Sequence, residues 1–303
     1  MNKLKSFIKN YWIALRVFSL TLAFAATAYG ILAAYINGYF SEQSPAYMTF
    51  LVIIILIAGL ASQAGANLIN DFFEGSFKYP PQGTKTINFL KRDRTYFDVF
   101  VFISGILILL LAGLIGLYLV YRTNIWMLVI GLIGLIGSYS YTGEPIVYKR
   151  HALGVPISFI LMGPLMSLGS YYAIAGSFSF TPILISLPTA LLIPALMISN
   201  EMRDFLRDQK FAMGTLTVKI GPKVSTFLFI SLVSGVYILT ILYVIIGLYP
   251  IYSLVSFISI PYAIKAIDNV KNAKNLGIQN TTKVHFTYSL IIIICFLISF
   301  IYK

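Results

Sequence analysis

The sequence predicts an all-α membrane protein that forms a single polytopic domain over residues 1–303. Composition is the first reason: 58% of the residues are hydrophobic, only 11% are charged, and the mean hydropathy is +0.86. A soluble domain carries about 25% charged residues, so we expect lipid to be the solvent of the fold. The other two reasons are a series of long apolar runs and an uneven distribution of basic residues between the links that join them.

The apolar runs predict nine transmembrane helices. A helix needs about 20 consecutive apolar residues to cross a bilayer, and stretches of about this length recur along the whole chain. In chain order, the predicted spans cover about 17–37, 48–70, 97–121, 125–142, 153–175, 181–200, 224–247, 249–266 and 284–302.

The basic residues predict the orientation of these spans. With nine helices, 20 of the 22 Lys and Arg residues fall in the N-terminal segment and in the links on one side, which leaves Arg122 and Lys303 on the other. The positive-inside rule then places the N-terminus in the cytoplasm and the C-terminus outside the cell membrane. We attribute the net charge of +12 to topology and contact with anionic lipid head groups; we predict no nucleic-acid partner, and the sequence identifies no protein partner.

Two acidic clusters interrupt the apolar pattern at the predicted cytoplasmic edge. The chain has only 10 Asp and Glu residues, and five of them lie in the segments 67–74 and 200–208, after the second and sixth predicted spans. Carboxylates beside a bilayer are costly and are usually kept for a function. The five are Asp71, Glu74, Glu201, Asp204 and Asp208.

The spacing within each cluster indicates a site for divalent cations. Asn200, Asp204 and Asp208 recur every four residues and would share one face of a helix, while Asp71 and Glu74 are three residues apart and can converge. Stacked carboxylates repel one another unless a cation lies between them, and Mg²⁺ prefers such oxygen ligands together with substrate phosphates. Capping of helix ends is a weaker explanation, because a helix C-terminus disfavours negative charge.

The motifs around these clusters resemble the UbiA superfamily of intramembrane prenyltransferases. The resemblance rests on Asn70-Asp71-x-x-Glu74 and on Asn200-x-x-Arg203-Asp204-x-x-x-Asp208, and it extends over nearly the whole chain. The segments 141–143, 163–172 and 215–221 are similar to the branch that prenylates 1,4-dihydroxy-2-naphthoate. The chain departs from the usual pattern at Glu74, where the family usually has Asp, and at Lys78, where many members have another Asp.

The resemblance implies a fold and an activity. It implies a bundle with a central cavity facing the cytoplasm, and Mg²⁺-dependent transfer of a polyprenyl group from polyprenyl diphosphate to an aromatic acceptor. The acceptor implied is 1,4-dihydroxy-2-naphthoate, in menaquinone biosynthesis. Two Mg²⁺ ions would stabilise the leaving diphosphate.

The resemblance also implies roles for individual residues. It assigns one Mg²⁺ to Asp71 and Glu74, with Asn67 and Asn70 orienting or ligating, and the second to Asp204 and Asp208, with Asn200 assisting. The cations expected to bind the diphosphate are Arg203, Arg207, Lys149 and Lys78, and the rings expected to face the allylic cation are Tyr139 and Tyr141.

Other readings of the same residues remain open. The acceptor could instead be 4-hydroxybenzoate, homogentisate, haem or a glycerol ether lipid, the chain could be an inactive family member, or the carboxylates could serve a cation-coupled transporter. A transporter would place charge near the middle of the bilayer, whereas these charges crowd one edge. Of the smaller features, we expect Gly131, Gly134 and Gly137 to allow close helix packing rather than to line a tunnel, and His151 and His285 to be solvated.

Overall fold

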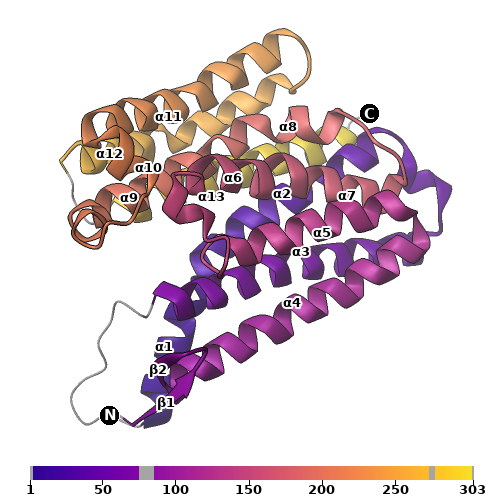
Figure 1. Cartoon of the computed structure of the whole chain (residues 1–303). Coiled ribbons are helices and arrows are strands. Elements are labelled where there is room, and N and C mark those ends of the chain that lie inside the picture. Colours follow the sequence, from indigo (N-terminus) through magenta and orange to yellow (C-terminus); the bar gives the residue numbers. More distant parts are fainter. Residues whose placement is uncertain (1–2, 75–84, 273–276, 302–303) are drawn as a thin grey trace.

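The computed structural model describes residues 3–74, 85–272 and 277–301 and shows a bundle of long helices (Figure 1). Within these residues, 8 helical segments are long and apolar enough to cross a membrane. This confirms the all-α membrane fold. The segments are Leu4–Ile36, Pro45–Glu74, Tyr96–Arg122, Gly154–Ala175, Thr181–Lys210, Pro222–Ile245, Ile251–Lys271 and Gly277–Ser299.

The fourth predicted span, 125–142, corresponds to a shorter helix, so the count of nine is not established. α5 covers Ile125–Ser140, only 16 residues, which reach about 24 Å against a hydrocarbon core of about 30 Å. Asn124 sets its start, because the Asn124 side chain accepts a hydrogen bond from the Trp126 amide. Beyond Ser140 the chain turns through a cis Glu144–Pro145 bond and enters the 3₁₀ helix η3, Tyr148–His151.

The N-terminal segment contains two helices where one span was expected. α1 (Lys3–Leu15) and α2 (Val17–Ile36) meet at Arg16, whose backbone is left-handed with φ 48° and ψ 52°. The 3₁₀ helix η1 (Tyr39–Glu42) then leads into α3, which covers Pro45–Glu74 and continues past the predicted end at residue 70. The first acidic cluster is therefore part of the helix.

A small hairpin precedes the next long helix. β1 (Thr86–Phe89) and β2 (Arg92–Thr95) pair antiparallel, with Thr86 opposite Thr95. Thr95 then caps α4, Tyr96–Arg122, in a capping box with Asp98. Figure 1 shows the hairpin and α1 beside the first turns of α4.

The fifth and sixth predicted spans, 153–175 and 181–200, are interrupted helices in the structure. α6 (Gly154–Ile160) and α7 (Met166–Ala175) are joined by a π-helical turn, Leu161–Leu165, which contains Pro164. Proline removes a backbone donor and disturbs the regular ladder of hydrogen bonds. α8 (Thr181–Ala190) is followed by α9 (Leu192–Lys210), which runs ten residues past the predicted end at 200 and makes the second acidic cluster helical.

The C-terminal part adds three long segments. A short helix, α10 (Leu216–Ile220), leads into α11 (Pro222–Ile245). The next segment begins as a 3₁₀ helix, η5 (Ile251–Ser259), and continues as α12 (Ile260–Lys271) before α13, Gly277–Ile301. Side chains three apart share a face in a 3₁₀ helix, and Ser253, Ser256 and Ser259 are all fully buried on it.

The core of the bundle is built around large rings whose hydroxyls are paired. Tyr29 on α2 is fully buried and its hydroxyl lies 2.6 Å from that of Thr189 on α8. Tyr288 on α13 is likewise buried, 2.6 Å from Thr240 on α11. These hydrogen bonds join α2 to α8 and α11 to α13.

Figure 1 shows the last turns of α3 and α9 at one end of the bundle. We call this the charged end.

Candidate active site

The last turns of α3 form a polar network with Arg16. In the amide orientation that satisfies both groups, the Asn70 carbonyl oxygen accepts from Arg16 Nη1 at 2.6 Å. Glu74 Oε2 accepts from Arg16 Nη2 at 2.7 Å. The left-handed turn at Arg16 separates α1 from α2 and places the Arg16 side chain at the charged end. The sequence analysis counted Arg16 only among the basic residues that set the topology, so it did not predict that Arg16 belongs to the site.

Asn67 holds helices together rather than facing open space. Its amide nitrogen donates to the Ser19 hydroxyl at 2.7 Å and to the Leu15 carbonyl at 2.9 Å, and its oxygen accepts from Gln63 Nε2 at 3.1 Å. Asp71 is half-buried one turn further on and lies within electrostatic range of Arg16. Asp71 therefore lies beside the Arg16 network in the last turns of α3.

Lys149 reaches the same network from the link after α5. Its side chain is only 10% exposed and its ammonium group pairs with Glu74 Oε1. The link is held in place by the Lys149 amide, which donates to the Tyr141 carbonyl at 3.2 Å, and by the left-handed Val147 just before η3. Both oxygens of Glu74 are thus occupied by cationic side chains.

Asp204 and Asp208 of α9 are paired with arginines of the same helix. Arg203 binds Asp204 through two hydrogen bonds of 2.8 and 2.6 Å. Arg207 contacts both neighbours, Asp204 at 3.1 Å and Asp208 at 2.8 Å. Asn200 lies on the same face, half-buried, two turns before Asp208. The predicted stacking of these groups at intervals of four follows from the helical conformation of α9.

The structure brings the two clusters to one place. Glu74 from α3 and Arg207 and Asp208 from α9 line the same small cleft, together with Phe211 and Met213. Residues 134 positions apart in the chain, Glu74 and Asp208, thereby face each other at the charged end. Glu201 points elsewhere: it is 2% exposed and accepts from the Thr217 amide at 2.8 Å, which ties α9 to α10.

Of the two predicted tyrosines, Tyr141 lies nearer the charged groups. Its ring centroid is 5.5 Å from the Lys149 ammonium. Burial raises the pKa of the Tyr141 phenol well above its usual value, and the carboxylates Glu74 and Glu201 raise it further. Tyr139 packs edge-on against Phe73, 6.3 Å between centroids, within an apolar cluster.

Three further residues were considered in the sequence analysis. Lys78 lies outside the described residues. His151 is exposed in η3, as expected. His285 is 1% exposed within α13, and its Nδ1 has no hydrogen-bond partner among the described residues, so the expectation that it would be solvated was wrong.

The donor atoms at this end suit a hard cation. Among the described residues, no group of three or more His, Cys, Asp and Glu side chains is already gathered as a metal site. Asp71, Asp204 and Asp208 nevertheless offer carboxylate oxygens, the ligands that Mg²⁺ prefers. Arg203 and Arg207, whose side chains are 41% and 45% exposed, balance the α9 carboxylates. Glu74 fits a metal less well, because both of its oxygens bind cationic side chains.

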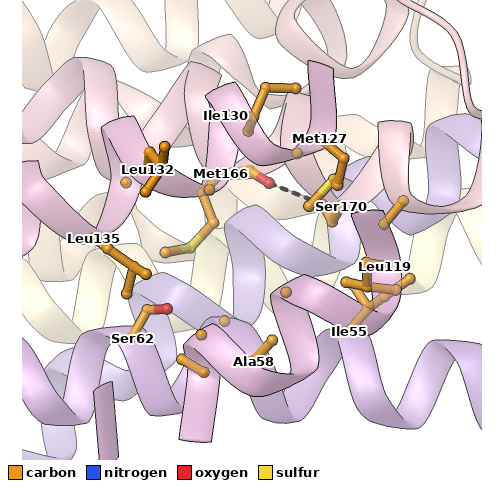
Figure 2. A pocket seen from close by; sticks show the side chains of 18 of the residues that line it. Ile55, Ala58, Ser62, Leu119, Met127, Ile130, Leu132, Leu135, Met166 and Ser170 are labelled. Atoms are coloured by element: carbon orange, nitrogen blue, oxygen red, sulfur yellow. Dashed lines mark hydrogen bonds between the residues drawn. The ribbon is translucent and has the colours of Figure 1, made fainter. Parts of the chain in front are cut away.

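An apolar cavity of about 400 Å³ adjoins this end of the bundle. It lies between α3, α4, α5 and the α6–α7 segment, with Thr27 from α2 on its wall. Figure 2 shows Ile55, Ala58 and Ser62 of α3 facing Met166 and Ser170 across it. Gln63 lines the cavity and also donates to Asn67, so the cavity begins one turn from the first acidic cluster.

Comparison with known proteins identifies the fold and the family. Residues 22–291 match the UbiA prenyltransferase family. A UbiA homologue from Aeropyrum pernix K1 covers 90% of this chain and 98% of its own, with a TM-score of 0.62 and 15% identity. A UbiA homologue from Archaeoglobus fulgidus, solved bound to DMAPP and Mg²⁺, covers 94% of this chain and 85% of its own, with a TM-score of 0.50 and 16% identity.

Two curated relatives are similar in sequence. The chain is 27% identical over 222 residues to the 1,4-dihydroxy-2-naphthoate octaprenyltransferase of Bacillus subtilis (strain 168), a match that spans 72% of this chain and 70% of the relative. It is 28% identical over 233 residues to UbiA prenyltransferase domain-containing protein 1 of Rattus norvegicus, spanning 76% of this chain and 66% of that protein.

Together, the fold and the charged end define a multi-span membrane enzyme with a polar cleft at one end. The chain belongs to the UbiA prenyltransferase family, because the family match covers most of its length. It is therefore a prenyltransferase, and the transporter reading is wrong.

Proposed function

We propose that this enzyme transfers a polyprenyl group from a polyprenyl diphosphate to the aromatic acceptor 1,4-dihydroxy-2-naphthoate, a step of menaquinone biosynthesis. The observation that carries the proposal is the meeting of carboxylates from α3 and α9 in one cleft beside Lys149 and Arg16. A diphosphate needs cations of this kind around it. The choice of acceptor follows the Bacillus subtilis relative, whose name specifies that substrate.

In this proposal the carboxylates of α3 and α9 hold Mg²⁺. Asp71 would bind one ion, and Asp204 and Asp208, with Asn200 assisting, would bind a second. Bound Mg²⁺ would stabilise the negative charge that develops on the leaving diphosphate. The Archaeoglobus fulgidus homologue, bound to DMAPP and Mg²⁺, supports this choice of metal.

Cationic side chains of the cleft would bind and orient the diphosphate. Lys149 is buried and its ammonium group is held by Glu74, so little conformational entropy would be lost when this group binds the diphosphate. Arg16 is held by Glu74 and Asn70 in the same way. Arg203 and Arg207 have exposed side chains and can turn from the carboxylates to the phosphates. Glu74 then positions two of these cations rather than serving as a primary metal ligand.

Tyr141 would line the site where the allylic cation forms. Its ring lies beside Lys149, and its phenol stays protonated because burial raises its pKa. The face of a tyrosine ring attracts a cation. The polar end would face the cytoplasm, because with nine spans 20 of the 22 basic residues fall in the N-terminal segment and in the links on that side.

The test is a turnover assay with the purified protein in lipid nanodiscs. Labelled geranylgeranyl diphosphate and Mg²⁺ would be supplied with each of four acceptors: 1,4-dihydroxy-2-naphthoate, 4-hydroxybenzoate, homogentisate and haem. We expect a prenylated naphthalene product by mass spectrometry. A product with a different acceptor alone would refute the acceptor assignment, and the absence of product with every acceptor would refute the proposed function.

A further inference from the structure

The walls of the apolar cavity contain glycines that face open space. Gly131 and Gly134 on α5 and Gly116 on α4 line it, and a Cβ atom added at any of the three would meet no atom within 4 Å. A glycine that serves helix packing behaves differently. At Gly137, one turn further along α5, an added Cβ would lie 2.5 Å from Leu161 Cδ1. The expectation of close packing therefore holds for Gly137 and is wrong for Gly131 and Gly134.

The absence of side chains at these positions keeps the cavity wide. The two α5 glycines are three residues apart, so they lie on one face of the helix. That face looks across the cavity toward α3 and α4, which contribute the opposite walls. A volume of about 400 Å³ exceeds the approximately 150 Å³ that suffices for a benzene molecule, so the space suits an extended apolar chain.

One end of the cavity lies close to the charged end. Gln63 belongs to its wall and is hydrogen-bonded to Asn67, and eight residues of α3, about 12 Å, separate Gln63 from Asp71. Ser138 marks the same end of the cavity on α5, three residues before Tyr141. An apolar chain attached to a group in the cleft would therefore extend along α5, first past Gly134 and then past Gly131.

We propose that Gly131 and Gly134 determine the longest prenyl chain that the enzyme accepts, an inference that rests on the proposed function. The prenyl tail of the donor lies in the cavity with its diphosphate in the cleft. Gly134 is seven residues from Tyr141, about 10 Å along the helix, and Gly131 is ten residues away, about 15 Å. A bulky side chain at Gly134 would block the tail closer to the reacting carbon than the same side chain at Gly131.

A tail of a bilayer lipid is the competing occupant. Leu114 and Leu117 belong to the α4 wall and are 65% and 57% exposed, so the cavity borders the lipid phase. A lipid in the cavity would give the glycines no influence on the length of the donor. The two occupants therefore make opposite predictions for the same variants.

The experiment compares Gly131→Leu and Gly134→Leu with the matched variant Ile136→Leu. Ile136 is on the same helix, 57% exposed, and does not line the cavity. Leucine favours a helix more than glycine, so we expect all three to fold, as checked by gel filtration and thermal unfolding in detergent. Each is assayed with dimethylallyl, geranyl, farnesyl and geranylgeranyl diphosphate.

We expect the ratio of kcat/KM for geranylgeranyl to that for dimethylallyl diphosphate to fall about tenfold or more in Gly134→Leu. In Gly131→Leu the fall should begin at a longer donor than in Gly134→Leu. Binding of the unreactive analogue geranylgeranyl thiodiphosphate should weaken in parallel, while Ile136→Leu keeps the wild-type ratio.

The outcomes separate this inference from the proposed function. If wild type turns over the donors and both glycine variants keep its length profile, the inference is wrong and the proposed function stands. The inference is equally wrong if Gly131→Leu restricts length more strongly than Gly134→Leu, or if Ile136→Leu changes the ratio as much as they do. If wild type turns over no donor, the proposed function fails and the inference falls with it.

Discussion

Glu74 offers a sharp test of how the charged end is held together. The substitution Glu74→Gln keeps the size of the side chain but removes the charge that pairs with Arg16 and Lys149. Arg16, Glu74 and Lys149 are 29%, 22% and 10% exposed in their side chains. The burial of the two ion pairs is therefore intermediate between that of a fully exposed pair and that of a fully buried pair.

The expected cost follows from that intermediate burial. An exposed ion pair contributes about 0–1 kcal/mol, and removal of one partner from a fully buried pair costs about 3–5 kcal/mol. For Glu74→Gln we expect a loss of about 2 kcal/mol in the free energy of unfolding. With about 2–4 °C per kcal/mol for a domain of 150–250 residues, the melting temperature should fall by about 4–8 °C.

The matched control is Glu144→Gln. Glu144 pairs with Arg92 at 2.5 Å, but the two side chains are 55% and 38% exposed. The same chemical change should therefore cost only about 0–1 kcal/mol. Both variants are melted in detergent with EDTA, so that divalent cations make no contribution, and the melts are repeated with Mg²⁺.

The reasoning about Glu74 would be refuted if Glu74→Gln and Glu144→Gln melted at the same temperature in EDTA. A difference that appeared only when Mg²⁺ was added would also contradict it, because Glu74 would then act as a metal ligand. The double variant Glu74→Gln with Lys149→Met should recover part of the loss, since it also removes the cation that was left unpaired.

Further predictions concern the reaction. Asp71→Ala or Asp204→Ala should lower prenyl transfer by about 10²–10³-fold or more while the protein remains inserted. The control Glu42→Ala, at an exposed site in η1, should keep wild-type turnover, and near-normal turnover in either Asp variant would exclude that residue from the site. Treatment with EDTA should stop transfer and added Mg²⁺ should restore it; transfer that continues in EDTA would exclude a divalent metal. Tyr141→Leu should slow transfer by about 2–30-fold, equivalent to a cation–π contribution of about 0.5–2 kcal/mol. Tyr141→Phe keeps the ring and should not slow transfer. Equal rates in the two variants would show that the ring has no part in the mechanism. Because burial raises the pKa of Tyr141, its phenol should still be protonated at pH 9, so the wild-type and Tyr141→Phe rates should have the same pH dependence up to that value.

The long apolar runs made the membrane fold predictable, because in lipid the backbone hydrogen bonds of each span must be satisfied within the protein, which favours helices. The ends of the helices were less predictable. α3 and α9 continue through their charged residues to Glu74 and Lys210, since a polar helix is stable once it has left the hydrocarbon. α5 stops at Ser140, too short for the span that its hydropathy suggested.

Sequence motifs alone identified the acidic residues of the candidate site. Asp204 and Asp208 are four residues apart, so they lie on one face wherever the segment is helical, and α9 is helical through both residues. Arg16 could not be found in this way, because one arginine near an N-terminal span looks like any other basic residue of the positive-inside pattern. Its role depends on a left-handed turn and on the distant Glu74, neither of which has a local signal.

The sequence by itself determined the class of protein, the candidate carboxylates and the family resemblance, because hydropathy and helical spacing are local properties of the chain. Only the tertiary structure decided which groups meet. It paired Glu74 with Arg16 and Lys149, and it turned Gly131 and Gly134 toward a cavity while Gly137 packs on Leu161. The physical reason is that contacts between helices depend on how each is rotated and tilted against its neighbours, which no single segment encodes.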